Sequence, residues 1–469
     1  MPCRRLFLCL LLLAAPGFAE EPKKEAPKKE STNPIIGNWL GTVKFGPIEL
    51  RLGFRITSDK DGKLTAKMDS FDQGAMNLPV ETVTFEKNVL TLKLPPFKIG
   101  YTGELQPDNE TIKGDFEQGL KIPMELKRVE KMPSLLRPQN PKKPYPYDET
   151  EVAFDSKAAG VKLGGTLTTP KGDGPFPAVV MITGSGPQDR DETLMGHKPF
   201  LVIADHLTRK GIAVLRFDDR GVGKSTGDHS KATSMDFAED AAGAVAFLKT
   251  RKEIGKIGLM GHSEGGLIAP IVAAKNPEIG FIIMMAGPGL PGDEILIAQS
   301  AAILKGAKME KAGPQTKELQ TKMFAMIKKD AEEKEVLAVV DEYVKSLPEK
   351  EQKEFKNIGG VARMNQVTTP WFRAFIKYDP RPTLQQVKCP VLAFNGELDI
   401  QVIPKENLTE IEKALKAGNN PDVTIKELPK LNHLFQTAKT GMVNEYGQIE
   451  ETIAPVVLDM VTEWILKRK

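Results

Sequence analysis

Apolar and polar residues alternate strictly between Ile48 and Ile56, where Leu50, Leu52 and Phe54 occupy the intervening apolar positions. Period two over this length predicts a β-strand with one buried face. The same alternation returns at 83–85, 90–94 and 122–126, and turn-forming sequences separate the runs. Residues 34–129 are therefore expected to form a small all-β barrel or sandwich.

Beyond residue 150, short apolar runs alternate with helix-like segments. Expected strands cover 162–169, 178–183, 212–217, 256–260, 281–285, 391–394 and 423–427, and expected helices cover 200–209, 236–250, 267–275 and 405–417. Such alternation indicates a largely parallel, buried sheet with helices on its faces. Residues 150–469 thus predict an α/β fold.

This rhythm stops between about 291 and 380, where Lys, Glu, Met and Ala dominate. Apolar residues recur there at helical spacing, in the groups 319, 323, 327 and 336, 340, 344. The pattern predicts a helical cap inserted into the α/β part, over the top of the sheet.

The first residues read as a basic stretch, a short apolar run and a small-residue boundary near Ala19. The run from Leu6 to Ala15 is too short to span about 30 Å of hydrocarbon, so stable membrane insertion is not expected. Residues 1–19 therefore predict a signal peptide and export, to the periplasm or out of the cell. The charged, Pro-interrupted segment 20–33 predicts a disordered tether, and the Pro-rich segment 130–149 predicts a linker.

Ser263 lies in Gly261-His262-Ser263-Glu264-Gly265, between an apolar run and a helix-like segment. This strand, sharp turn and helix predict a nucleophile elbow, in which glycines are needed because a Cβ would collide with the neighbouring strand or helix. Ser225 also fits the GxSxG pattern, but a polar segment follows it instead of a helix. The flanks favour Ser263.

A serine nucleophile needs a base, and the base needs an acid that orients it. His433 follows the last expected strand, as the order Ser, Asp, His requires, whereas the other four histidines precede or adjoin the elbow. The neighbouring His262 is expected to point elsewhere on the turn. Asp399 is the preferred acid, and Glu397, just after the turn glycine, is the fallback.

Backbone N–H groups usually stabilise the oxyanion of acyl transfer. The elbow supplies the N–H of Glu264, the residue after the nucleophile. A second donor is expected in the glycine-containing loop after the strand at 178–183, where Ser185 is preferred and Gly186 comes next.

Two further segments have competing interpretations. The run around Gly223-Lys224-Ser225 resembles a phosphate-binding loop, but Asp218 stands where that loop requires glycine, so no nucleotide is expected. The charged run 189–191 fits either a substrate contact or an internal salt-bridged turn.

The composition limits which partners, disulfides and cofactors are expected. The formal net charge of +3 does not favour nucleic acid as a partner. Cys389 alone follows the expected signal peptide, so an internal disulfide is excluded in the mature chain. With five histidines and no zinc-like spacing, neither a metal nor another cofactor is expected.

The sequences GSGPQDRDET, LRFDDRGVGKSTG, GHSEGGLIAP, YDPRP and GELDIQV occur in an order that resembles the α/β-hydrolase superfamily, specifically exported bacterial serine esterases with a helical cap. The segments GNWLGTV, DSFDQGA and IKGDFEQG resemble a small β domain that precedes some of these enzymes. The resemblance implies Ser263 as nucleophile, Asp399 as acid and His433 as base, with Ser185 and Glu264 as oxyanion donors. Thr183 departs from the family, where many relatives carry histidine.

The expected function is hydrolysis of small carboxylic esters through an acyl-enzyme on Ser263. The same triad also serves peptide bonds, so a serine peptidase acting on short peptides is the alternative. A third hypothesis is a binding protein whose β domain carries the function.

Overall fold

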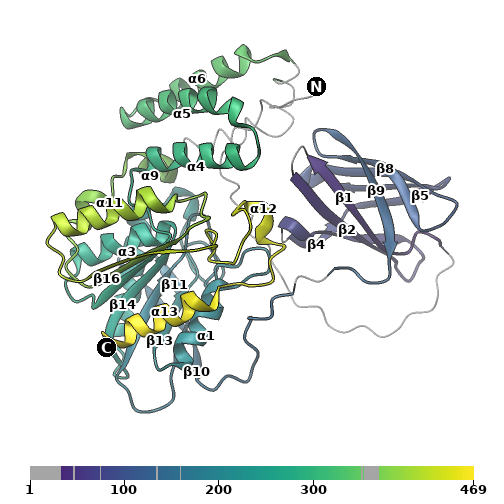
Figure 1. Cartoon of the computed structure of the whole chain (residues 1–469). Helices are drawn as coiled ribbons and strands as arrows, with labels where there is room; N and C mark the ends of the chain where they lie inside the picture. Colours follow the sequence, from purple (N-terminus) through teal and green to yellow (C-terminus); the bar gives the residue numbers. More distant parts are fainter. Residues whose placement is uncertain are drawn as a thin grey trace.

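Two β-sheets, each with its own hydrophobic core, organise the chain (Figure 1). The computed structural model describes residues 33–45, 48–73, 75–133, 136–158, 160–349, 352 and 369–468. The predicted signal peptide 1–19, and the tether 20–33 apart from its last residue, lie outside the described residues.

In the described part of residues 33–133, the first sheet is antiparallel, in the order β4-β3-β2-β1-β9-β8-β7-β6-β5. Its elements are β1 Gly37–Phe45, β2 Ile48–Ser58, β3 Leu64–Ser70, η1 Phe71–Gln73, β4 Ala75–Val80, β5 Thr82–Glu86, β6 Val89–Leu94, η2 Pro95–Phe97, β7 Ile99–Leu105, β8 Thr111–Glu117 and β9 Lys121–Val129. Contacts of β3 with β5 and of β4 with β6 bring its two ends together, so the sheet is nearly closed. Leu52, Phe54 and Ile56 are buried inside it, as their alternation predicted.

The second sheet has the order β10-β11-β13-β12-β14-β15-β16-β17 within the described residues. Its strands are β10 Asp148–Asp155, β11 Lys162–Thr169, β12 Phe176–Ile182, β13 Ala213–Phe217, β14 Ile254–His262, β15 Phe281–Met285, β16 Val391–Gly396 and β17 Val423–Leu428. The pairs from β13 through β12 to β17 are parallel, and β10 and β11 are antiparallel. The predicted largely parallel sheet is therefore confirmed.

Helices cover both faces of this sheet. Successive residues of a strand point to opposite faces, so each strand contributes to two cores. On β12, Val179 packs in the core shared with α1 and α13, whereas Val180 packs in the core shared with α2, α3 and α11. These helices are α1 Pro199–Arg209, α2 Ser234–Lys249, α3 Glu264–Lys275, α11 Pro404–Ala417 and α13 Pro455–Leu466. The arrangement places the amino end of α3 at the carboxyl edge of the sheet.

Between β15 and β16 the chain forms the inserted helices, which Figure 1 shows stacked at one end of the α/β part. They are α4 Gly292–Gly306, η4 Glu310–Ala312, α5 Gly313–Lys328, α6 Glu333–Ser346, α9 Pro370–Lys377 and α10 Arg381–Leu384. The apolar positions 319, 323 and 327 on α5, and 336, 340 and 344 on α6, are buried. Their periodicity was thus a correct indication of helices.

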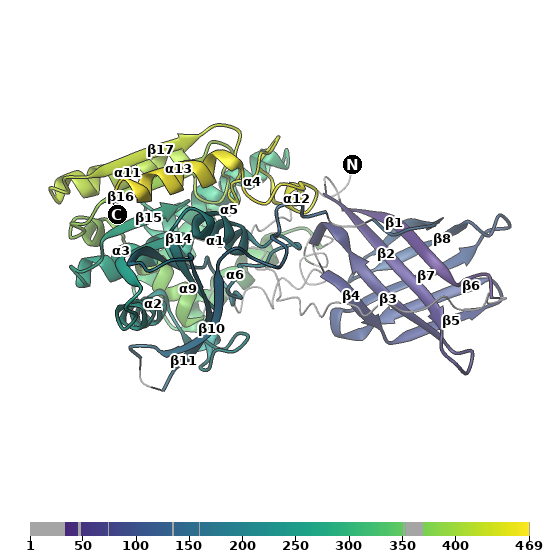
Figure 2. The ribbon, with the colours of Figure 1, turned by 90° about the horizontal axis from the view of Figure 1, so that it is seen from below.

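The nearly closed sheet lies beside the α/β part in both Figure 1 and Figure 2. Contact between them includes η1 against the short helix α12, Val443–Tyr446. Arg137, in the segment that joins the sheets, donates to the carbonyl oxygens of Met195 at 2.7 Å and Gly447 at 2.9 Å. The joining segment is therefore anchored to loops of the α/β part.

Some elements were not expected from the sequence, and β10 and α13 are among them. β10 begins at Asp148, inside the expected linker, and its mostly exposed residues give only a weak apolar alternation. Helix α13 packs at the end of the chain and was not predicted.

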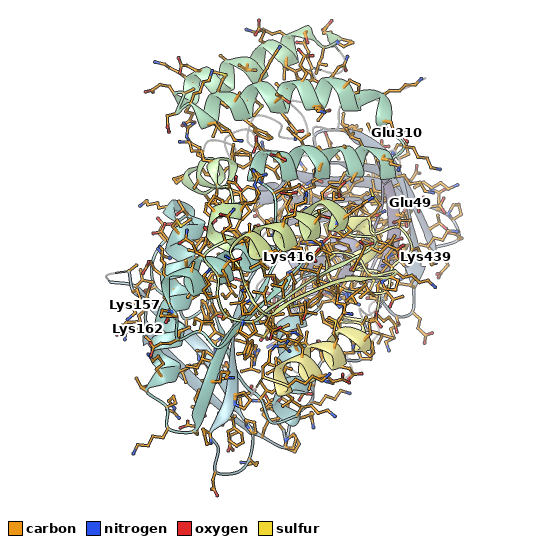
Figure 3. All side chains as sticks on the ribbon, turned by 60° about the vertical axis from the view of Figure 1, so that its left-hand side comes forward. Glu49, Lys157, Lys162, Glu310, Lys416 and Lys439 are labelled. Atoms are coloured by element: carbon orange, nitrogen blue, oxygen red, sulfur yellow. The ribbon has the colours of Figure 1, made fainter. Side chains whose placement is uncertain are left out.

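Charged side chains cover the outside of both parts, and those labelled in Figure 3 are all exposed: Glu49, Lys157, Lys162, Glu310, Lys416 and Lys439.

Candidate active site

Ser263 stands between the end of β14 and the first residue of α3, with φ 51° and ψ −117°. A positive φ is strained for a residue with a Cβ and marks the sharp turn of an elbow. A Cβ on Gly261 would lie under 3.0 Å from the Gly265 carbonyl oxygen, and a Cβ on Gly265 equally close to that of Ile182. Both glycines are therefore required by the tight approach of helix and strand, as the pattern predicted.

Asp399 and His433 follow the carboxyl ends of β16 and β17, and the structure joins them. His433 Nδ1 lies 2.7 Å from Asp399 Oδ2, and the residues are only 4% and 2% exposed. The other carboxylate oxygen accepts the backbone N–H groups of Gln401 at 2.7 Å and Val402 at 3.0 Å. The carboxylate is thus fixed by its own loop and presents one oxygen to the imidazole.

Glu397, the fallback acid, is exposed and accepts the Lys430 backbone N–H at 2.9 Å. The hydrogen-bond geometry therefore favours Asp399 as the partner of His433.

Ser263 and His433 lie at the same edge of the sheet, because β14, β15, β16 and β17 are consecutive parallel neighbours. Within the described residues, however, the Ser263 hydroxyl makes no hydrogen bond, to His433 or to any other group. Hydrogen bonds of catalytic groups are often long before substrate binds. The three-residue triad remains a prediction.

The loop after β12 runs directly beside the elbow, since a Cβ on Gly184 would lie 3.3 Å from the Ser263 Cβ. Among the described residues, the backbone N–H groups of Ser185, Gly186 and Glu264 have no acceptor. All three are thus available to a ligand oxygen, and the choice between Ser185 and Gly186 stays open. Thr183, the departure from the family pattern, donates its hydroxyl to the buried Asp219 at 2.7 Å.

The side chain of Glu264 plays a part that sequence reasoning missed. Its Oε1 accepts the Ser234 hydroxyl at 2.6 Å and the indole N–H of Trp371, on α9, at 2.7 Å. Burial raises the pKa of this carboxyl, although hydrogen bonds from Ser234, Trp371 and Ser185 oppose the rise. One carboxyl therefore links the elbow helix to an inserted helix and to the candidate oxyanion loop.

His262 and Glu192 were also missed, and their hydrogen bonds connect the loops on either side of Ser263. The adjacency of His262 to the serine hides this arrangement in the sequence, because its partners come from distant loops. Glu192 has a positive φ of 53°, which the sequence does not signal.

The alternatives considered from sequence have structural roles. Ser225 donates to the Asp218 carbonyl oxygen at 2.7 Å and accepts the Gly164 N–H at 3.0 Å, so its hydroxyl is engaged in a turn. In the charged run, Arg190 pairs with Asp218 at 2.7 Å and Asp191 pairs with Arg216. That run is an internal salt-bridged turn.

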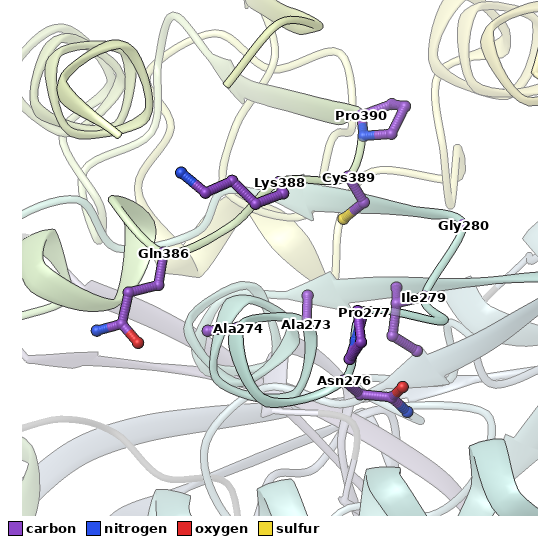
Figure 4. A pocket seen from close by; sticks show the side chains of 10 residues that line it. All are labelled: Ala273, Ala274, Asn276, Pro277, Ile279, Gly280, Gln386, Lys388, Cys389 and Pro390. Carbon is purple, nitrogen blue, oxygen red and sulfur yellow. The ribbon is translucent and has the colours of Figure 1, made fainter. Parts of the chain in front are cut away.

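A separate cavity of about 260 Å³ lies at the opposite end of the sheet, where β15 and β16 begin (Figure 4). It is lined by Ala273, Ala274, Asn276, Pro277, Ile279, Gly280, Gln386, Lys388, Cys389 and Pro390. These residues adjoin the carboxyl end of α3, whereas Ser263 precedes its amino end. The cavity is therefore distinct from the candidate site.

In the ranges that the structure describes, no group of three or more His, Cys, Asp or Glu residues is arranged to hold a metal ion. In those ranges, too, none of the helices combines the length and apolar character that crossing a membrane requires.

Comparison with known proteins identifies related sequences and structures. A family model described as "Serine aminopeptidase, S33" matches residues 198–351. Esterase EstD of Thermotoga maritima is 28% identical over 446 residues, which cover 92% of this chain and 99% of that protein. This coverage is too large to be confined to the α/β part, so the similarity extends into the nearly closed sheet.

Solved structures that match part of the chain include the esterase Pf2001 of Pyrococcus furiosus, with a TM-score of 0.41 and 17% identity, covering 68% of this chain and 91% of that chain. Est1E of Butyrivibrio proteoclasticus, solved with ferulic acid, has a TM-score of 0.40 and 16% identity, covering 68% of this chain and 98% of that chain.

Proposed function

Because the chain belongs to the α/β-hydrolase superfamily, we propose that it is a serine carboxylesterase that uses Ser263, His433 and Asp399. The observation that carries the proposal is the buried 2.7 Å hydrogen bond between Asp399 and His433 at the edge where Ser263 occupies a strained turn. A buried carboxylate that orients an imidazole beside an activated serine is the arrangement that acyl transfer needs.

In the proposed mechanism, Ser263 Oγ attacks the ester carbonyl carbon while His433 Nε2 takes the hydroxyl proton. The backbone N–H groups of Glu264 and Ser185 stabilise the resulting oxyanion. His433 then gives the proton to the departing alkoxide. The alcohol leaves, and the acyl group remains on Ser263 as the acyl-enzyme. In the second half of the cycle, water attacks the acyl carbonyl carbon while His433 takes its proton. The bond to Ser263 Oγ then breaks, His433 returns the proton to that oxygen, and the carboxylic acid is released.

The relation to Esterase EstD favours an ester as substrate, because that protein is similar along nearly its whole length. The description of the matching family model favours peptide hydrolysis as a second candidate. An aminopeptidase must recognise an ammonium group, for which a free carboxylate is the natural partner. Glu192 and Glu264 are the carboxyls beside the elbow and its neighbouring loop, and both already accept hydrogen bonds from protein groups. Neither is therefore a free carboxylate of the kind that an aminopeptidase needs.

The assay compares wild type and Ser263→Ala on nitrophenyl esters of short acids, and on a library of short peptides. Ester turnover that disappears in a folded Ser263→Ala variant supports the proposal. Turnover that persists in that variant refutes the assignment of the nucleophile, and cleavage of peptides in preference to esters supports the second candidate. Binding without any serine-dependent turnover would favour a binding protein.

We further propose that residues 1–19 direct export and are removed near Ala19. Sequencing the amino terminus of the chain recovered from its native host tests this: an intact Met1 contradicts the proposal.

A further inference from the structure

His262, the last residue of β14, is 6% exposed and uses both ring nitrogens. Its Nδ1 lies 2.9 Å from Glu192 Oε1, and its Nε2 lies 3.0 Å from the His433 backbone carbonyl oxygen. The residue beside the candidate nucleophile is therefore hydrogen bonded to the residue that follows the oxyanion loop and to the candidate base itself.

The acceptors determine the protonation of the ring. A backbone carbonyl oxygen only accepts, so Nε2 carries a proton. Glu192 Oε1 also accepts the Gly184 N–H at 2.8 Å, and an ionised carboxylate oxygen satisfies both contacts when Nδ1 carries a proton as well. The geometry therefore fits a buried ion pair between an imidazolium and a carboxylate.

The electrostatic surroundings agree with that assignment. Burial lowers the pKa of His262, but the Glu192 carboxylate, the hydrogen bond to the His433 carbonyl and the charge of Asp399 outweigh it and leave the pKa raised. The titratable groups that face His262 are Glu192, Asp399 and the His433 ring, whose centroid lies 4.9 Å away.

The ion pair joins three segments that surround Ser263. Glu192 reaches Gly184, one residue before the candidate oxyanion donor Ser185, while His262 reaches the backbone of His433. Glu192 holds a positive φ of 53°, and such backbone strain persists where surrounding interactions enforce it. The hydrogen bonds to Gly184 and His262 are interactions of that kind.

We propose that His262 and Glu192 form a positioning pair that fixes the oxyanion loop and the His433 loop relative to Ser263. The proposal rests on the proposed esterase function for its catalytic consequence. Neither residue is assigned a contact with substrate; the pair acts through Gly184 and the His433 backbone. A displacement of about 1 Å in such a site costs on the order of 100-fold in rate.

Two variants separate the contributions of the pair. Glu192→Gln keeps the shape of the side chain but removes its charge. An amide oxygen at the position of Oε1 accepts the Gly184 N–H but cannot donate to Nδ1 of a neutral His262, whereas an amide NH₂ group there donates to Nδ1 but cannot accept from Gly184. His262→Asn removes the link to His433 with an uncharged side chain. The matched control is His206→Gln, on α1, which removes a histidine that faces Asp459 at 3.6 Å.

The first measurement is hydrogen–deuterium exchange of the full chain, which needs no catalytic activity. Peptides covering 184–192 and those covering 431–436 should exchange faster together in both variants, and neither should change in the control. Unchanged exchange in either loop of folded variants overturns the proposed coupling. If Glu192→Gln fails to fold, His262→Asn alone decides.

The second measurement is ester turnover. We expect kcat to fall about 10- to 100-fold with KM within about twofold in both variants, because positioning and not binding is lost. Unchanged kcat in folded variants overturns the catalytic role.

These outcomes are distinguishable from failure of the proposed function. A wild type without ester turnover contradicts the esterase, while faster exchange of both loops in the variants still establishes the coupling. An active wild type whose variants match it in rate and exchange contradicts the positioning pair alone.

Discussion

Replacing Asp399 by asparagine tests the role of the acid in the proposed triad. In the wild type, Asp399 Oδ1 accepts two backbone N–H groups, from Gln401 and Val402, while Oδ2 faces His433 Nδ1 at 2.7 Å. In the Asp399→Asn variant, the amide oxygen is expected to keep the two backbone donors. The NH₂ group of the new side chain then faces Nδ1, which must accept, so the ring proton moves to Nε2 and His433 cannot take the serine proton.

The size of the expected loss in kcat follows from the cost of flipping the new amide side chain. Turning the amide to restore the active tautomer would leave two backbone N–H groups facing an NH₂ group, at roughly 1–3 kcal/mol each. The resulting penalty of about 2–6 kcal/mol reaches the roughly 5.5 kcal/mol that corresponds to the 10⁴-fold loss typical of such a substitution. We therefore expect kcat to fall by about 10³- to 10⁴-fold.

The assay is hydrolysis of a nitrophenyl ester, with thermal unfolding to confirm that the variant is folded. Glu397→Gln is the matched control, because Glu397 is exposed and holds only the Lys430 backbone N–H among the described residues. It should retain kcat within about twofold. A folded Asp399→Asn variant within tenfold of wild type, or a large loss in Glu397→Gln, would refute the assignment of the acid.

Three further outcomes are expected. Gly265→Ala should destabilise the fold by several kcal/mol, because its Cβ meets the Ile182 carbonyl oxygen, whereas Gly313→Ala, with open space, should not; melting temperatures compare them. Ser225→Ala should lower the free energy of unfolding by roughly 1–3 kcal/mol and keep kcat, as denaturant titration and turnover would show. Burial raises the pKa of Cys389 to about 11, so iodoacetamide at pH 8 should modify it on the order of 100-fold more slowly in the folded chain than in urea; equal rates would contradict that burial.

The alternation of apolar residues predicted most of the fold, because burial on one or both faces of a strand leaves a direct imprint on the sequence. The ranges 162–169 and 281–285 match β11 and β15. β10 escaped prediction since an exposed edge strand needs few apolar residues, and the prolines before it indicated a linker.

The residues of the candidate site were proposed from chain order and local motif, which are the features that the sequence displays. Ser263 is marked by its glycines, and Asp399 and His433 by their positions after consecutive strands. The Glu192–His262 pair and the bond from Trp371 to Glu264 were not predictable, because their partners are 70 and 107 residues apart in the sequence. Only folding brings such side chains together, and no pattern of nearby residues in the sequence predicts their contact.

The most direct test of the proposed nucleophile is covalent labelling of the full chain with a fluorophosphonate, followed by mass spectrometry of the modified peptide. We expect stoichiometric modification of Ser263, abolished in Ser263→Ala and strongly slowed in Asp399→Asn. Modification of another serine, or none in a folded chain, would contradict the proposal that Ser263 is the nucleophile of a serine esterase.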